Sequence, residues 1–181
     1  MSKHIVVFAA NECKKEKENL YYSMAYETGK LLAQEGFITV TGGGPGLMNE
    51  TMRGAFENGG RTIGFCLNVK GREHSIYLSE KRMYYDLRKR QRELMDIGDG
   101  FLALPGGLGT IYEISGVLAL KRKGEISPDR PMILIDTIYK NLEKLFHSLQ
   151  EEGLIGHDLS SLYRMVQNPM QAIELLKGSF S

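Results

Sequence analysis

The chain of 181 residues has no tryptophan and only two cysteines, Cys13 and Cys66. So few cysteines argue against a disulfide framework and against a zinc site built from CxxC pairs. Long apolar runs are also missing: residues 5–10, IVVFAA, are too few for the core of a signal peptide or for a membrane span. We therefore expect a cytoplasmic protein with reduced thiols and no membrane partner.

An excess of charge of one sign is absent as well. The 23 Lys and Arg residues nearly balance the 22 Asp and Glu residues, which leaves a net charge of +1. Broad binding to nucleic acid needs a basic footprint, so we expect no nucleic-acid partner. The length matches one domain of ~150 residues or slightly more, and we expect residues 1–181 to form a single domain. Glycine is the one residue in excess, with 21 copies against a usual share of ~7%.

Short β-branched or aromatic runs alternate with longer segments that have helical periodicity. The expected strands cover residues 5–9, 37–41, 62–66, 101–104 and 131–135, with an edge strand at 164–166. The expected helices cover residues 21–32, 47–57, 87–97, 111–123, 139–152 and 169–177, and the polar residues 68–79 are expected to form a loop. This alternation predicts an α/β fold with a doubly wound, mostly parallel, Rossmann-like sheet.

Two glycine-rich segments each follow an expected strand and precede an expected helix. They read TGGGPGLM at residues 41–48 and LPGGLGT at residues 104–110. Glycine lets the backbone approach an anion closely, and the N-terminus of the next helix offers free N–H groups. One such segment could be a simple tight turn, but two at equivalent places favour phosphate binding. The candidate phosphate-binding residues are Gly43, Gly44, Pro45, Gly46, Gly106, Gly107, Leu108, Gly109 and Thr110.

Neither segment fits the dinucleotide pattern GxGxxG followed by an acidic residue, and neither fits GxxxxGK[ST]. A nicotinamide-dependent oxidoreductase and a P-loop NTPase are therefore not supported.

Arg90 and Glu113 are charged residues at positions where the sequence predicts burial or contact with a ligand. Arg90 shares a face of its expected helix with Leu87 and Leu94, so it requires a carboxylate, a phosphate or a ligand. A structural ion pair is the alternative. Glu113 follows Thr110 by three residues and can reach a ligand held at the second glycine segment. Its alternative roles are charge stabilisation of the helix N-terminus or a capping box with Thr110.

Residues 105–113, PGGLGTIYE, match the pattern PGGxGTxxE and resemble the signature of the Lonely Guy (LOG) family. Its members are cytokinin riboside 5′-monophosphate phosphoribohydrolases, often labelled "possible lysine decarboxylase". The segment GGGPGLM at 42–48 resembles the family's other glycine motif, and the family's arginine falls on Arg90. The resemblance runs from about Ile5 to about Leu176. It makes Gln91, which stands where the family usually has lysine, a candidate substrate contact. The pair Arg72-Glu73 resembles an Arg-Glu that touches substrate in some members, so Glu73 is a second candidate contact.

Two further departures from the family pattern are the turn Ala9-Ala10-Asn11, where the family has a Cys-Gly-Ser type turn, and Tyr112, which is often glutamate. The resemblance implies hydrolysis of the N-glycosidic bond of a nucleoside 5′-monophosphate by a homodimer. Glu113 would stabilise an oxocarbenium-like state or activate water, and Arg90 would orient Glu113 and assist departure of the base.

This reaction implies no metal and no organic cofactor. Lysine decarboxylation would require pyridoxal phosphate on a lysine, and neither glycine segment contains a lysine. The alternative function is a carrier of a nucleotide or phosphorylated cofactor. Such carriers keep the glycine segments but need not keep the arginine–glutamate pair.

Overall fold

A seven-stranded sheet organises the computed structural model, which describes residues 2–156 and 159–180. The strand order is β4-β3-β2-β1-β5-β6-β7, and every neighbouring pair is parallel. The strands are β1 (His4–Phe8), β2 (Ile38–Thr41), β3 (Thr62–Leu67), β4 (Glu80–Tyr84), β5 (Gly100–Ala103), β6 (Met132–Ile135) and β7 (Arg164–Val166). The predicted α/β fold with a parallel sheet is confirmed.

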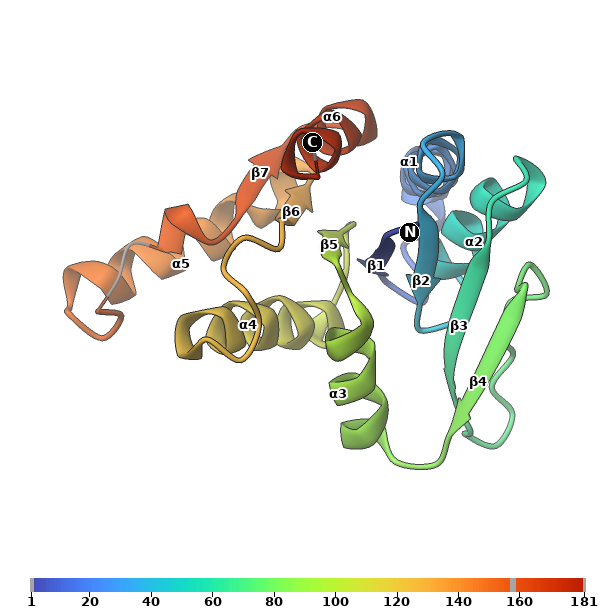
Figure 1. Ribbon diagram of the computed structural model, residues 1–181, viewed down its shortest axis with the longest axis horizontal. Helices are drawn as coiled ribbons and strands as arrows, with labels where there is room; N and C mark the ends of the chain where they lie inside the picture. Colours follow the sequence, from blue (N-terminus) through green and yellow to red (C-terminus); the bar gives the residue numbers. More distant parts are fainter. Residues whose placement is uncertain (1, 157–158, 181) are drawn as a thin grey trace.

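Helices cover both faces of this sheet (Figure 1). They are α1 (Lys15–Gln34), α2 (Leu47–Glu57), α3 (Leu87–Ile97), α4 (Leu108–Lys123), α5 (Lys140–Glu151) and α6 (Pro169–Ser179), with short 3-10 turns η1 (Thr137–Tyr139) and η2 (Leu159–Ser161). Alternate residues of β1 point to opposite faces: Ile5 and Val7 pack with α1, α2 and α6, whereas Val6 and Phe8 pack with α3, α4 and α5. The sheet is therefore buried on both sides, as its apolar runs predict.

The structure differs from the sequence prediction in three elements. The edge strand β4 was not predicted, although residues 68–79 before it form a loop as expected. Helix α1 begins at Lys15 rather than near Tyr21, and α4 begins at Leu108 rather than Ile111. The earlier start of α4 matters for function because it places residues 108–110 in the first turn of the helix.

The chain order reverses beside β1, which has β2 on one side and β5 on the other. The segments that follow β1 and β5 therefore lead to opposite faces of the sheet, to α1 on one and through the second glycine segment to α4 on the other, and leave a crevice between them. None of the helices in residues 2–156 and 159–180 is long and apolar enough to cross a bilayer. Within the same residues, no group of three or more His, Cys, Asp or Glu side chains is placed to hold a metal ion.

Candidate active site

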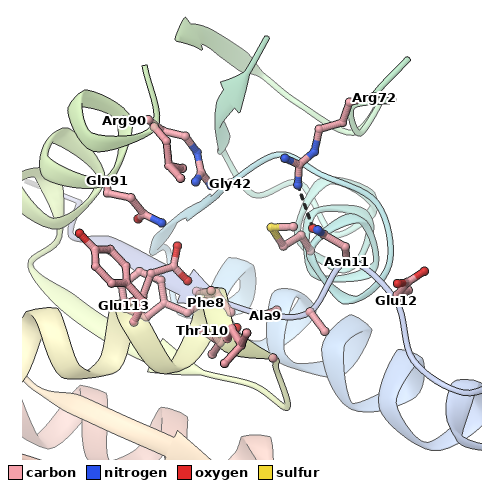
Figure 2. A pocket seen from close by; sticks show the side chains of 18 of the residues that line it. Phe8, Ala9, Asn11, Glu12, Gly42, Arg72, Arg90, Gln91, Thr110 and Glu113 are labelled. Carbon is pink, nitrogen blue, oxygen red and sulfur yellow. Dashed lines mark hydrogen bonds between the residues drawn. The ribbon is translucent and has the colours of Figure 1, made fainter. Parts of the chain in front are cut away.

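A cavity of about 810 Å³ lies at this crevice (Figure 2). Its walls come from the turn after β1, from Gly42 after β2, from Arg72 in the β3–β4 loop, and from the first turns of α3 and α4. Ala10 ties the two glycine segments together: its N–H donates to the carbonyl oxygen of Pro105 (3.2 Å), and its own carbonyl accepts from Leu47 N–H (3.1 Å). The two predicted segments therefore meet at one place.

The second glycine segment brings the N-terminus of α4 to the cavity. Gly107, Leu108, Gly109 and Thr110 all line it, and the N-cap Gly107 offers no side-chain hydrogen bond to the helix. The N–H groups of the first turn, with the positive end of the helix dipole, therefore face a space suited to an anion. Because the N-cap is Gly107, Thr110 and Glu113 do not form the capping box considered above. Gly106 does not line the cavity but packs against Thr110: a Cβ added to Gly106 would lie 2.0 Å from Thr110 Oγ1.

The first glycine segment shapes the wall from behind. Gly42 lines the cavity, whereas Gly43, Gly44, Pro45 and Gly46 are not among its lining residues. Gly46 adopts φ +66°, and a Cβ there would lie 2.0 Å from the carbonyl oxygen of Asn11. This close approach locks the segment against the turn after β1. Gly42, which directly precedes the four predicted phosphate-binding residues, is therefore the residue of this segment that reaches the cavity.

Arg90 on α3 is buried, with 9% of its surface exposed. Its Nε donates to the carbonyl oxygen of Phe65 on β3 at 2.7 Å. Nη2 lies against Gly42, where an added Cβ would come within 2.0 Å of it. Burial lowers the pKa of the guanidinium, and Glu113 partly offsets this. Within the described chain Arg90 makes no direct ion pair, so the structural ion-pair interpretation does not hold.

Glu113 on α4 is also buried, with 7% exposed, and it faces the same cavity. Burial raises the pKa of its carboxyl group, while the charge of Arg90 and the neighbouring Gln91 amide partly offset this. Figure 2 shows the nitrogen end of Gln91 turned toward the Glu113 carboxylate. A carboxylate with a raised pKa, beside a fixed guanidinium in a cavity, is suited to proton transfer or to stabilising a developing positive charge.

Comparison with known proteins identifies the family. Residues 48–176 match the family described as possible lysine decarboxylase. The chain belongs to this family, the LOG family. A probable cytokinin riboside 5′-monophosphate phosphoribohydrolase of Oryza sativa subsp. japonica is 30% identical over 179 residues, which cover 97% of this chain and 72% of the rice protein. The cytokinin riboside 5′-monophosphate phosphoribohydrolase of Rhodococcoides fascians is 29% identical, over 75% of this chain and 70% of that protein.

Another probable cytokinin riboside 5′-monophosphate phosphoribohydrolase of Oryza sativa subsp. japonica is 28% identical. The match covers 82% of this chain and 66% of that rice protein. Among solved structures, the molybdenum cofactor carrier protein of Chlamydomonas reinhardtii matches with a TM-score of 0.76 and 26% identity, covering 99% of both chains. A molybdenum cofactor binding protein from Rippkaea orientalis shares the fold, with a TM-score of 0.76 and 24% identity.

In this LOG-family chain the turn after β1 contacts the β3–β4 loop through Asn11 and Arg72, a pairing that the sequence did not predict. Arg72 reaches from the β3–β4 loop to the cavity, and its Nη2 donates to Asn11 Oδ1 at 3.1 Å (Figure 2). Glu73, the predicted contact, is exposed and is not among the lining residues. The departure Ala9-Ala10-Asn11 was the available signal, since a polar side chain after a buried strand lies at the ligand-binding edge of the sheet.

Proposed function

We propose that this chain hydrolyses the N-glycosidic bond of a nucleoside 5′-monophosphate, a cytokinin riboside 5′-monophosphate or AMP, to the free base and ribose 5-phosphate. The observation that carries the proposal is the convergence of Arg90, Glu113 and the α4 N-terminus on one cavity. A helix N-terminus suits the 5′-phosphate, and a buried carboxylate suits the sugar carbon that becomes positive. The names of the curated relatives support the same reaction.

The chemistry follows from this placement. The phosphate binds residues 107–110, which directs the ribose along α4 toward Glu113. As the bond from C1′ to the base nitrogen breaks, the sugar acquires oxocarbenium character that the Glu113 carboxylate stabilises. Glu113 takes a proton from the water whose oxygen bonds to C1′, and the same proton then passes from Glu113 to the departing base nitrogen, which leaves the carboxylate free again. Arg90 orients the carboxylate and assists departure of the base; none of these steps calls for a metal or an organic cofactor.

A second candidate function is the binding of a phosphorylated cofactor without turnover. The Chlamydomonas reinhardtii carrier favours it, because the two chains match over nearly their full lengths. The Arg90–Glu113 pair favours the hydrolase, since a carrier has no use for a buried carboxylate beside the sugar carbon.

We further propose a homodimer whose second subunit borders the cavity. Leu108 is 86% exposed, and Tyr112 and Leu87 are more than half exposed, although all three line the cavity. Apolar side chains gathered at a cavity mouth are typical of an interface. Sedimentation should show a dimer that Leu108→Asp dissociates. The near-neutral charge supports a protein that acts on free nucleotides rather than on nucleic acid, and the small number of cysteines supports a cytoplasmic location.

Incubation with AMP and with its N6-isopentenyl analogue, followed by measurement of the free base, tests the hydrolase. Release of base from either substrate supports it, and comparison of the two rates gives the preferred base. Tight binding of both without any release would favour the carrier instead.

A further inference from the structure

The first turn of α4 has few side-chain contacts to hold it in place. Leu108 is 86% exposed, and a Cβ added to Gly107 or Gly109 would meet no other part of the fold within 4 Å. No side chain caps the helix at Gly107. The body of the helix, by contrast, is anchored in the core by residues such as Ile114, which is fully buried. The position of the first turn therefore depends on the segment that leads into it, residues 104–107.

Two carbonyl oxygens of this segment are anchored by hydrogen bonds from other parts of the fold. The carbonyl oxygen of Pro105 accepts from the N–H of Ala10 at 3.2 Å. The carbonyl oxygen of Leu104 accepts from the hydroxyl of Tyr139, which lies in η1 beyond the end of β6. Leu104 and Tyr139 are both buried, and burial raises the pKa of the Tyr139 phenol. The hydroxyl therefore keeps its proton at neutral pH and remains a donor.

The backbone at the end of β6 explains why a side chain takes this role. Asp136 has φ +91°, and it is the one non-glycine residue of the described chain with a positive φ. Its N–H donates to the carbonyl oxygen of Val166 on β7 at 3.0 Å, and its carboxylate accepts from the N–H of Ile138 at 2.8 Å. The N–H of Asp136 thus serves β7, and Leu104 on the β5 side receives its donor from Tyr139 instead. Such backbone strain persists only where surrounding contacts fix it.

These contacts give Tyr139 a role at a distance from the substrate. It does not line the cavity, yet it holds the residue from which the second glycine segment starts. We propose that Tyr139 is a positioning residue, whose hydroxyl fixes the N–H groups of residues 107–110 for the 5′-phosphate. The inference rests on the placement of the phosphate in the proposed function. Because Glu113 lies in the anchored body of α4, loss of the hydroxyl disturbs the phosphate contacts and leaves this carboxylate in place.

Tyr139→Phe removes the hydroxyl and keeps the ring in the core. The test measures dissociation constants of AMP, ribose 5-phosphate and adenosine for the wild-type protein and the variant. We expect binding of AMP and ribose 5-phosphate to weaken about 10-fold, and binding of adenosine to change by less than about 2-fold. Tyr26→Phe is the matched control, because it removes a hydroxyl that donates to Glu57 away from the cavity. This control should bind all three ligands as the wild-type protein does.

A general structural role would weaken all three ligands alike, and that result in Tyr139→Phe would overturn the inference. Unchanged binding of AMP and ribose 5-phosphate would overturn it too, as would a wild-type protein that binds AMP no more tightly than adenosine. Base release is measured separately. If the wild-type protein releases no base but the phosphate-specific loss is found, the hydrolase proposal fails and the role of Tyr139 stands. If base is released and AMP binding is unchanged in the variant, the hydrolase stands and this role fails.

Thermal unfolding shows whether Tyr139→Phe is folded at the assay temperature. Asp136→Gly is the second variant, because glycine adopts the same φ without strain but lacks the carboxylate that accepts from Ile138. It keeps the Tyr139 hydroxyl and loosens η1, so AMP and ribose 5-phosphate should bind about 3-fold more weakly and adenosine equally well. If Tyr139→Phe does not fold, this variant decides: the phosphate-specific loss supports the inference, and unchanged binding overturns it.

Discussion

The guanidinium Nε of Arg90 donates to the carbonyl oxygen of Phe65 at 2.7 Å, which joins α3 to β3. This bond fixes the arginine through the backbone rather than through a carboxylate. The terminal Nη2 of Arg90 lies against Gly42, and the residue lines the cavity. Arg90 therefore joins two elements of the fold with one nitrogen while it lines the cavity.

Arg90→Lys should lower both activity and stability. A lysine lacks the planar fork, and the buried carbonyl of Phe65 would lose its donor. We expect base release from AMP to fall at least about 100-fold and the free energy of unfolding to fall by about 1–3 kcal/mol. Steady-state kinetics and urea unfolding measure the two effects. Arg92→Lys, on the exposed side of the same helix, is the matched control. Full activity in Arg90→Lys would refute the assigned role.

The pH dependence of base release should report the raised pKa of Glu113. Burial raises this pKa, so the active carboxylate is protonated, and activity lost, at a pH above the usual ~4.3 of glutamate. The acid limb of kcat/KM should therefore lie above that value. In Gln91→Lys an added positive charge favours the carboxylate, and the limb should move to lower pH. An acid limb that stays in place in this variant would argue against Glu113 as the titrating group.

Arg72→Ala should weaken substrate binding without much effect on chemistry. The side chain lines the cavity away from Glu113 and carries a positive charge toward an anionic ligand. We expect KM to rise about 10-fold and kcat to change by less than about 3-fold. Glu73→Ala, one residue further along the same loop, should leave KM unchanged because Glu73 lies outside the cavity. A higher KM in Glu73→Ala with an unchanged KM in Arg72→Ala would instead identify Glu73 as the substrate contact.

Lys121 should make stability depend on pH in the alkaline range. It is buried, its Nζ donates to the carbonyl of Leu162 at 2.6 Å, and burial lowers its pKa from 10.5 to about 8. Between these values the unfolded chain binds a proton that the folded chain does not, so stability rises with pH, by about 3 kcal/mol at most. Below pH 8 both forms carry the proton and the effect is constant.

Urea unfolding at pH 7.5 and pH 10 measures this effect, with Lys121→Met as the reference. Tyr84, whose pKa is raised to about 12, titrates alike in both proteins and cancels in the comparison. Identical pH dependence in the two proteins would show that the Lys121 amine is not the source.

Most of the fold was predictable because the central strands are continuous apolar runs. Strand β4 could not be predicted because it lies at the edge of the sheet. Only Tyr84 of this strand is buried, and its sequence, EKRMY, is mostly charged. The spacing of apolar residues predicts that Leu87 lies on the buried face of α3, yet Leu87 is 51% exposed. It is the first residue of that helix and lies at the cavity mouth rather than over the core.

The candidate site residues that belong to a sequence motif could be predicted. Arg90 and Glu113 occupy motif positions, and the structure brings both to one cavity. Asn11, Gly42 and Arg72 come from three different connections, and the sequence did not predict that they meet, although Gly42 belongs to the first glycine segment and Arg72 to the pair Arg72-Glu73. Only the strand order, with β1 between β2 and β5 and β3 beyond β2, brings these connections together.

The most direct test is to quantify adenine and ribose 5-phosphate from AMP with the wild-type protein and with Glu113→Gln, which preserves shape but removes the carboxylate. We expect equal amounts of the two products from the wild-type protein. We expect at least about 100-fold less from the variant, whose dissociation constant for AMP should stay within about 3-fold. No adenine from the wild-type protein, or an equal rate from Glu113→Gln, would show that Glu113 does not catalyse this hydrolysis.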